Sequence, residues 1–400
     1  MKPHNDVKAA LRLFGFDSLR NEQIKPIEAL RKGQCIFVNA PTSAGKSLIY
    51  QLPAVLHQDQ LTIVVEPTIS LMLDQVQKLN RLGFCAAHLN SSLTKTQRQE
   101  LIKRLGDLTF LYTTPEQLIR PAFIKQLKHI DVYQIVIDEV HCILGWGYSF
   151  RGAYLELGDV IRKIDPQCVS AFTATASPED EDEIQRLLGV EMKVFHCQSD
   201  RKNLIYAKKH ADSRKEKLRL VKGYLKKYRP RRTVIYCNTH RSVESVAAEL
   251  EKKYPGQIGA YHSGLSNSEK NRRQIRFCSG EYTIMVATSA FGMGIDLPDI
   301  DLVLHFNMPF SMNDYIQQTG RAGRDGRKAH CILLYGDEDF WTAATLVEPC
   351  GNARLDESLR QMVNFCNDRK HCLKKLMAEA LGQEPGKNCR FCTNCQAGRR

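Results

Sequence analysis

A short run rich in Ser and Gly stands between an apolar segment and a helix-like one, the context of a phosphate-binding loop. Residues 40–47 read Ala-Pro-Thr-Ser-Ala-Gly-Lys-Ser. In such a loop backbone amides bind phosphates, the lysine reaches the β and γ phosphates, and the final serine hydroxyl ligates Mg²⁺. Ala40 stands where the pattern usually has Gly, and a tight strand-to-helix connection is the alternative. The candidate residues are Thr42, Ser43, Ala44, Gly45, Lys46 and Ser47.

Two adjacent acids, Asp138 and Glu139, follow the apolar run of residues 134–137. In open α/β sheets ligands bind at the carboxyl ends of strands. Asp138 would hold Mg²⁺ through water there, and Glu139 would polarise the attacking water. A solvated acidic turn is the alternative, but it would not explain the phosphate loop upstream. The two motifs together predict nucleotide hydrolysis.

A pair of arginines, Arg321 and Arg324, lies in the run 317–326, which reads Gln-Gln-Thr-Gly-Arg-Ala-Gly-Arg-Asp-Gly. Their spacing puts both on one side of a helical turn. They could neutralise charge that develops on a transferred phosphoryl group, as arginine fingers do. A basic loop that binds nucleic-acid phosphates is the alternative.

Cysteines near the C-terminal end have the spacing of metal ligands. Cys389, Cys392 and Cys395 form a tight triple, and Cys372 or Cys366 would complete the set. Four thiolates suit tetrahedral zinc and leave no open position, so we expect a structural ion. A redox or free-thiol cluster is the alternative.

Alternating elements must position these groups. Short apolar, β-branched runs alternate with segments of helical periodicity, which predicts right-handed βαβ units and parallel sheets in two successive α/β blocks. We expect helices at 69–82, 96–105 and 242–252, and a domain boundary in the polar stretch 200–217. The predicted strands are 35–38, 61–65, 109–112, 134–137, 169–172, 193–195, 233–236, 258–261, 283–287, 302–305 and 331–335.

The composition fits a globular chain of two or three domains. Its 400 residues are 43% hydrophobic and 25% charged, which excludes disorder. No apolar run approaches the roughly 20 residues of a membrane span, so no membrane partner is expected. A net charge of +13 favours a polyanionic partner. The first ten residues lack the apolar core of a signal peptide, which predicts a cytoplasmic protein.

In their order, these motifs resemble those of superfamily 2 helicases. Two further runs resemble the RecQ family in particular, namely FGFDSLRNEQ at 14–23 and HCILGWGYSFR at 141–151. The resemblance covers nearly the whole chain. It implies an α/β fold of two tandem RecA-like P-loop domains and a small C-terminal helical zinc-binding subdomain, with bounds of 1–198, 199–340 and 341–400.

The resemblance also implies residue roles at the nucleotide and the metal. Phe16 and Arg20 would stack on adenine while Gln23 reads it, and Asp296 would contact the ribose. In the family the first zinc ligand precedes a basic pair, which selects Cys372 over Cys366. The implied zinc ligands are Cys372, Cys389, Cys392 and Cys395.

DNA contacts are implied chiefly for the aromatic-rich run. In the family this loop couples single-stranded DNA binding to ATP hydrolysis; a hydrophobic loop packed in the core is the alternative. The run departs from the family pattern at residues 144, 145, 148 and 149, and Gln318 stands where the family usually has Glu. Trp146 and Phe150 would stack on bases, Arg151 would reach a phosphate, His141 would link the loop to the phosphate site, and Asn238, His262 and Thr288 would contact DNA.

The resemblance thus implies an ATP-dependent DNA helicase that uses ATP, Mg²⁺ and Zn²⁺. It would move 3′-to-5′ on single-stranded DNA and unwind tailed duplex DNA, in repair or recombination. It would be a short form without the winged-helix and helicase-and-RNase-D C-terminal domains. The alternatives are an RNA helicase, and a translocase or nucleic-acid-binding scaffold with weak unwinding. Lys46, Asp138, Glu139 and Arg324 favour an enzyme.

Overall fold

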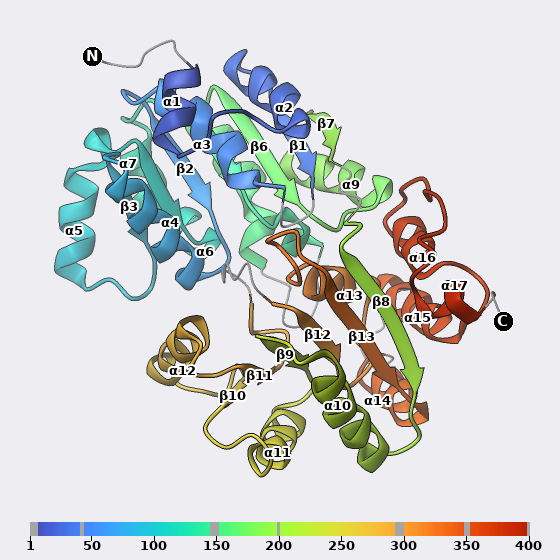
Figure 1. Ribbon diagram of the computed structural model, residues 1–400. Helices are drawn as coiled ribbons and strands as arrows, with labels where there is room; N and C mark the ends of the chain where they lie inside the picture. Colours follow the sequence, from blue (N-terminus) through green and yellow to red (C-terminus); the bar gives the residue numbers. More distant parts are fainter. Residues whose placement is uncertain are drawn as a thin grey trace. The chain divides into compact units, whose positions relative to one another are not determined.

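The computed structural model of the chain describes residues 7–40, 44–144, 152–197, 201–292, 300–347 and 353–397. The chain divides into two compact units, Met1–Ser199 and Asp200–Arg400. Each unit is built on one parallel sheet with helices on both faces (Figure 1). No helix in these ranges is long and apolar enough to cross a membrane.

The first unit has a seven-stranded sheet in the order β3-β4-β2-β5-β6-β1-β7. The strands are β1 (Ile36–Asn39), β2 (Leu61–Val65), β3 (Ala86–Leu89), β4 (Phe110–Thr113), β5 (Val132–Ile137), β6 (Cys168–Thr173) and β7 (Lys193–His196). The helices are α1 (Val7–Leu13), α2 (Asn21–Arg31), α3 (Lys46–Leu56), α4 (Ile69–Arg81), α5 (Lys95–Lys103), α6 (Pro115–Leu118), α7 (Pro121–Leu127), α8 (Leu157–Ile164) and α9 (Pro178–Leu188), with 3₁₀ turns η1 (Leu105–Asp107), η2 (Val140–Ile143) and η3 (Gly152–Glu156).

Both faces of the central strands of this sheet are buried, which explains why those strands are predominantly apolar. Successive side chains of a strand point to opposite faces, so each strand feeds two cores. In β1, Ile36 and Val38 pack with helices α1 to α4, whereas Phe37 packs with α6 to α9 on the other face. The carboxyl ends of all paired strands therefore meet at one edge of the sheet.

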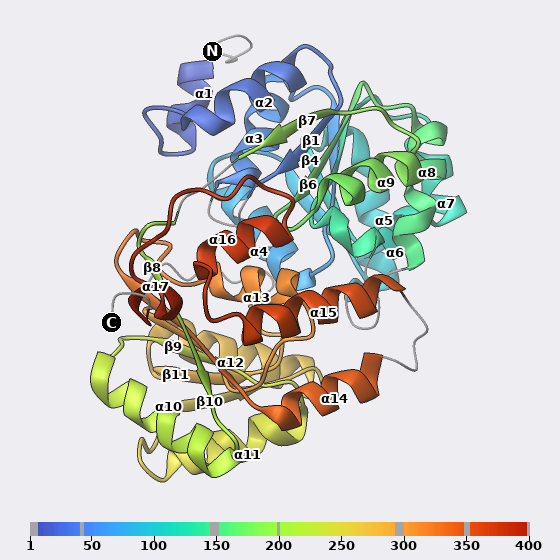
Figure 2. The same cartoon turned by 90° about the vertical axis from the view of Figure 1, so that its right-hand side faces the viewer.

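The second unit has a six-stranded parallel sheet in the order β10-β11-β9-β12-β13-β8. Helices α10 and α11 cover one face, and α12 to α16 contribute to the core on the other (Figure 2). The strands are β8 (Leu204–His210), β9 (Thr233–Tyr236), β10 (Ile258–Tyr261), β11 (Ile284–Ala287), β12 (Leu302–His305) and β13 (Ala329–Tyr335). The helices are α10 (Arg214–Tyr228), α11 (His240–Glu251), α12 (Asn267–Ser279), α13 (Met312–Thr319), α14 (Asp337–Val347), α15 (Ala353–Asn367), α16 (Leu373–Ala380) and α17 (Thr393–Ala397).

The predicted two-block α/β architecture is confirmed, and each predicted strand is present within one or two residues of its expected bounds. Two strands escaped the sequence pattern. Strand β3 is short, contains His88 and is only half-buried at its two central positions at one edge of the first sheet, and β8 lies in the polar stretch 200–217. That stretch is more than a boundary, because it supplies an edge strand paired with β13 and the start of α10.

Candidate nucleotide and zinc sites

The phosphate loop leaves the end of β1 and enters α3. Lys46 is the first residue of α3, and Gly45 before it has a φ of 71°. This left-handed conformation favours Gly. Ala44, Gly45, Lys46 and Ser47 are therefore placed as a strand-to-helix phosphate loop requires, whereas Thr42 and Ser43 lie outside the described residues.

Lys46 faces both predicted acids at the carboxyl edge of the sheet. Its Nζ lies 3.6 Å from Asp138 Oδ1 and 3.8 Å from Glu139 Oε1. Asp138 follows β5, and its N–H donates to Val65 O over 3.0 Å. Glu139 adopts a φ of 49° and donates its N–H to Asp138 Oδ1 over 2.9 Å. The turn after β5 thus directs two adjacent carboxylates toward one lysine.

A third carboxylate, that of Glu66, belongs to the same group of charges. Burial alone would lower the pKa of Lys46, but the charges of Glu139, Asp138 and Glu66 together raise it. Burial, followed by repulsion from Asp138 and Glu139, raises the pKa of Glu66 well above its ordinary value. The family resemblance implies that the run beginning at Glu66 lines the DNA and coupling surfaces of the first domain, and it does not predict Glu66 at the nucleotide site. An acid directly after the apolar run 61–65 nevertheless carries the same signal as Asp138 after 134–137.

His141 connects the acids to β6. Its Nδ1 lies 3.1 Å from Thr173 Oγ1 and 3.3 Å from Glu139 Oε2. Thr173 Oγ1 also accepts a hydrogen bond from the Thr175 N–H over 3.2 Å. Within the described part of the chain, His141 therefore links Glu139 to the turn after β6. Trp146, Phe150 and Arg151, the other members of its predicted DNA-binding run, lie outside the described residues.

The predicted adenine element surrounds the N-terminal end of α2. The Phe16 side chain is 50% exposed, as a stacking platform requires, while Gln23 is buried. Gln23 Nε2 donates to Ala44 O over 3.1 Å and to Gly45 O over 3.2 Å, and Gln23 Oε1 accepts from Arg20 N over 3.0 Å. Gln23 thus binds the phosphate loop itself, a contact that the sequence did not reveal.

The predicted arginines follow α13 in the second unit. Arg321 is buried, with its Nη1 donating to Gly292 O, and Arg324 is half-buried. The positive charges of Arg321 and Arg324 both act on the buried hydroxyl of Tyr236. Asp296, the predicted ribose contact, lies outside the described residues.

The remaining predicted DNA contacts lie together at one edge of the second sheet. Asn238, His262 and Thr288 follow β9, β10 and β11, which are adjacent parallel strands. Asn238 Nδ2 donates to Met308 O over 2.9 Å, and His262 Nε2 lies 2.9 Å from Glu244 Oε1. The fold therefore gathers these three residues at the carboxyl edge of the sheet, the edge at which open α/β sheets bind ligands.

Four cysteines converge in the C-terminal part of the second unit. The Sγ atoms of Cys372, Cys389, Cys392 and Cys395 all lie within 4.8 Å of one another. N–H groups surround them, including Cys389 N to Cys372 Sγ over 3.3 Å. Burial alone would raise the pKa of Cys372, but these N–H groups lower it to about 7. Burial raises the pKa of Cys389, Cys392 and Cys395, so Cys372 is the thiol of the four that ionises most readily. Four clustered sulfurs fit a tetrahedral zinc ion.

Cys366 is not part of this cluster. It is buried in the core of the second unit, where burial raises the pKa of its thiol to about 12. The structure therefore separates the two cysteines that the spacing alone left as alternatives.

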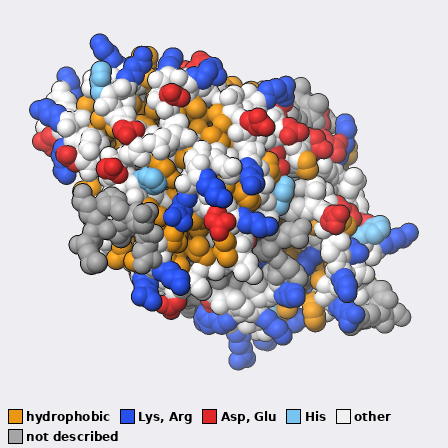
Figure 3. All heavy atoms as spheres, turned by 90° about the horizontal axis from the view of Figure 1, so that it is seen from above, with side chains coloured by type: hydrophobic (Ala, Val, Ile, Leu, Met, Phe, Trp, Pro, Cys, Tyr) orange, Lys and Arg blue, Asp and Glu red, His pale blue; other side chains and the backbone are white. Residues whose placement is uncertain are grey.

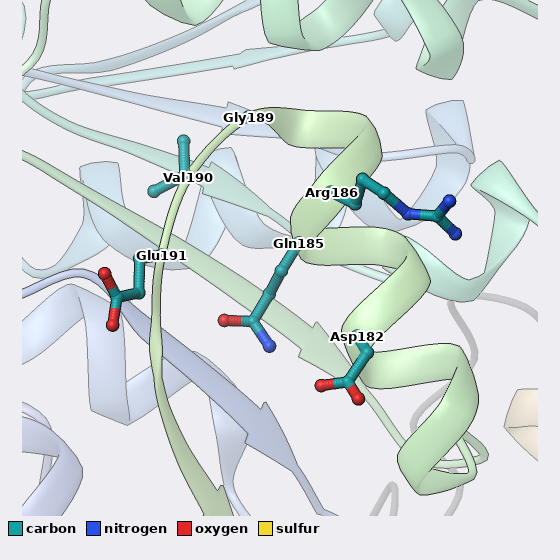
Figure 4. Close-up of a pocket in the computed structure, with 6 residues that line it drawn as sticks. All are labelled: Asp182, Gln185, Arg186, Gly189, Val190 and Glu191. Atoms are coloured by element: carbon teal, nitrogen blue, oxygen red, sulfur yellow. The ribbon is translucent and has the colours of Figure 1, made fainter.

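Two surface features carry no comparable chemistry. The hollow beside the end of α9 is lined by Asp182, Gln185, Arg186, Gly189, Val190 and Glu191 (Figure 4). Gln185, at its centre, already donates to Glu181 O and accepts from Met192 N. On the face shown in Figure 3, Lys and Arg side chains are interspersed with acidic ones and do not form one patch.

Family models match most of the chain. They are the DEAD/DEAH box helicase at residues 20–184, the helicase conserved C-terminal domain at 216–326 and the RecQ zinc-binding model at 338–396. The ATP-dependent DNA helicase RecQ of Bacillus subtilis is 35% identical over 96% of this chain and 65% of its own length. The chain belongs to the RecQ helicase family.

Other relatives of this RecQ-family chain have similar coverage. The RecQ helicase of Pasteurella multocida is 35% identical over 96% of the chain and 61% of its own length. The ATP-dependent DNA helicase Q1 of Rattus norvegicus is 34% identical over 97% and 64%, respectively. The chain thus spans somewhat less than two thirds of the length of each of these three relatives.

Solved helicase structures share its fold. The Mycobacterium smegmatis helicase Lhr, bound to single-stranded DNA and AMP-PNP, has a TM-score of 0.69 at 20% identity, covering 88% of this RecQ-family chain and 50% of its own. The S. cerevisiae protein Dbp5, bound to RNA and ADP BeF3, has a TM-score of 0.69 at 15% identity, covering 90% and 97%. The predicted pair of RecA-like domains is thereby confirmed.

Proposed function

We propose that this RecQ-family chain is an ATP-dependent DNA helicase that binds single-stranded and tailed duplex DNA. It moves 3′-to-5′, unwinds duplex DNA and serves DNA repair or recombination in the cytoplasm. We assign the two RecA-like domains to residues 1–198 and 199–340 and the zinc-binding subdomain to 341–400. The observation that carries the proposal is the approach of Lys46 to Asp138 and Glu139, in a chain whose residues 338–396 match the RecQ zinc-binding model.

The residues of the first domain fit ATP and Mg²⁺. Lys46 is cationic and buried at the start of α3, where helix N–H groups also favour phosphate. Ser47 and Asp138 would hold Mg²⁺, which neutralises phosphate charge when it is bound. Glu139 orients the attacking water. Arg321 and Arg324 are proposed to neutralise charge on the transferred phosphoryl group.

DNA binding is proposed for the aromatic-rich run and for Asn238, His262 and Thr288. Base stacking on Trp146 and Phe150 would contribute about 1–3 kcal/mol per base without sequence preference. His141, in contact with Glu139 and Thr173, is suited to relay the state of that run to the attacking water. This relay would make ATP hydrolysis depend on DNA.

Steady-state ATP hydrolysis by the full chain, with and without single-stranded DNA, tests the proposal. DNA should stimulate hydrolysis, and Glu139→Gln should reduce the stimulated rate by about 100-fold or more. Glu100→Gln, on the exposed side of α5, is the matched control and should keep the rate.

Other outcomes identify the alternatives. Stimulation by RNA but not by DNA would replace the DNA helicase with an RNA helicase. An unstimulated rate equal to that of Glu139→Gln would leave a nucleic-acid-binding scaffold. Unwinding of a 3′-tailed but not a 5′-tailed duplex is expected from the proposed direction.

A further inference from the structure

Glu66 occupies the sheet position next to Asp138. It follows β2, and Val65 at the end of β2 pairs in register with Ile137 at the end of β5. Asp138 follows Ile137, so the two acids are the next residues of two adjacent parallel strands. Side chains at equivalent positions of neighbouring strands point to the same face of a sheet. Glu66 and Asp138 are therefore side by side at the edge that carries the phosphate loop.

The carboxylate of Glu66 is buried without a hydrogen-bond donor. The side chain is 1% exposed, and neither oxygen has a hydrogen-bond partner among the residues that the structure describes. The backbone of Glu66 is satisfied, because its N–H donates to Thr113 O over 2.9 Å. A buried carboxylate without a donor is unfavourable, so an unmet requirement for a positive or donating ligand remains at this atom pair.

The charges around Glu66 indicate which ligand meets that requirement. Glu66, Asp138 and Glu139 interact electrostatically with one another and with one buried ammonium group, that of Lys46. When ionised, three carboxylates and one ammonium leave an excess of two negative charges. A divalent cation would bring the group to neutrality, and hard cations of this kind prefer oxygen ligands.

We propose that Glu66 is a third acidic residue of the Mg²⁺ site, which it serves by accepting hydrogen bonds from metal-bound water. This inference rests on the proposed function, which gives Mg²⁺ its place beside Ser47 and Asp138. Mg²⁺ retains several waters in protein sites and takes one or two carboxylates directly, so Glu66 need not touch the ion. If Glu66 has this role, the nucleotide-free protein already binds a divalent cation at this edge of the sheet.

Binding of Mn²⁺ to the nucleotide-free, zinc-loaded full chain tests the proposal without ATP hydrolysis. Free Mn²⁺ is followed by electron paramagnetic resonance during titration of wild type, Glu66→Gln and Glu100→Gln. The cysteine cluster does not compete strongly, because thiolates select softer metals than Mn²⁺. We expect one site in wild type and Glu100→Gln, and about tenfold weaker binding in Glu66→Gln, since the amide keeps the shape but not the charge.

Two results would overturn the proposal, namely wild type without a Mn²⁺ site, or equal affinity in wild type and Glu66→Gln. Thermal unfolding with and without Mg²⁺ provides a second readout. Glu66→Gln should be at least as stable as wild type without Mg²⁺, because repulsion is removed, and should lose most of the stabilisation that Mg²⁺ gives wild type. An unchanged Mg²⁺ stabilisation would also overturn the role of Glu66.

The two proposals fail separately. A chain that binds Mn²⁺ through Glu66 but hydrolyses no ATP would overturn the proposed function and support the cation site. A chain whose ATP hydrolysis is stimulated by DNA, but whose Mn²⁺ affinity is unchanged by Glu66→Gln, would support the proposed function and overturn the role of Glu66.

Discussion

His305 Nε2 and Gln318 Oε1 lie 2.8 Å apart within the core of the second unit. Because the amide oxygen accepts, Nε2 carries the proton of a neutral imidazole. Burial lowers the pKa of His305 to about 4, although the hydrogen bond to Gln318 opposes the shift. Tyr236 and Tyr315 pack against the ring, and the charge of Arg321 acts on Tyr236. Burial thus keeps His305 neutral, and the side chain at 318 is the hydrogen-bond partner that opposes this shift.

Gln318→Glu should change how stability depends on pH. In wild type the unfolded chain binds the His305 proton with a pKa of about 6.5. Neutral His305 therefore contributes fully to the free energy of unfolding above that pH. This contribution declines as the pH falls toward 4, by on the order of 3 kcal/mol in full. A carboxylate at 318 raises the folded-state pKa of His305, so the decline between pH 7 and 5 should shrink. Urea unfolding of both proteins at pH 7 and pH 5 measures this decline in the free energy of unfolding.

Gln317→Glu is the control for that experiment, since it adds an acid to the same helix at a half-buried position. It should keep the wild-type pH dependence. If Gln318→Glu also keeps it, the hydrogen bond to His305 does not set the charge state of the ring.

Gly292→Ala should displace Arg321. Gly292 has a φ of 109°, and a Cβ there would lie 2.6 Å from the Arg321 Cζ. We expect DNA-stimulated kcat to fall by about tenfold or more if Arg321 acts on the transferred phosphoryl group. Backbone strain alone would destabilise the fold by about 1–3 kcal/mol. Gly256→Ala shares the strain, with a φ of 75°, but meets nothing within 4 Å. Equal loss of kcat in both variants would contradict a specific effect on Arg321.

The sequence predicts the elements and motifs of this chain better than their contacts. Strands such as β5 and β9 are buried on both faces, so they appear as predominantly apolar, β-branched runs. Edge strands β3 and β8 have polar positions and carry a weaker pattern. Lys208 in β8 is buried because carbonyl groups accept hydrogen bonds from its ammonium group. The hydrophobicity of the sequence does not predict this burial.

The residues of the candidate sites also differ in how far the sequence predicts them. Lys46, Asp138 and Glu139 stand at fixed offsets from apolar strands, so the topology of the parallel sheet alone brings them to one edge. The contact of Gln23 with Ala44 and Gly45 joins segments distant in the sequence, and no local pattern encodes it. The same is true of the choice between Cys366 and Cys372, which only the packing of α15 and α16 makes visible.

Lys208→Met should weaken the attachment of the C-terminal helices to the second sheet. Lys208 Nζ donates to Phe365 O over 2.5 Å, to Cys366 O over 3.0 Å and to Asp368 O. These carbonyls end α15, where a cation is favourable. Leaving them without a donor should destabilise the unit by about 1–3 kcal/mol in guanidinium unfolding. Lys209→Met, at the exposed neighbouring position, should have little effect. Equal stability of the two variants would show that the three carbonyls find other donors.

Loss of zinc should destabilise the core of the second unit as well as the segment that carries the four cysteines. Cys392 is buried in the same core as Leu373 and Phe365, so its environment depends on residues of the sheet and of α15 and α16. Cys392→Ser should reduce zinc content well below one ion per chain and lower the Tm of the second unit. Metal analysis and circular dichroism measure both. Cys85→Ser, at an exposed position in the first unit, should change neither. Full zinc content in Cys392→Ser would contradict the four-cysteine site.

Gln23→Ala separates two roles of one amide. If Gln23 only reads adenine, its loss should raise KM for ATP and leave hydrolysis of GTP unchanged. Because both Nε2 hydrogens bind Ala44 O and Gly45 O, we expect a second effect, a loosened phosphate loop that slows both nucleotides. Two lost hydrogen bonds predict about a tenfold or greater fall in kcat/KM for ATP, and a smaller fall for GTP. Gln34→Ala, exposed in the same unit, should match wild type. An effect on ATP alone would assign Gln23 to the base and remove it from the loop.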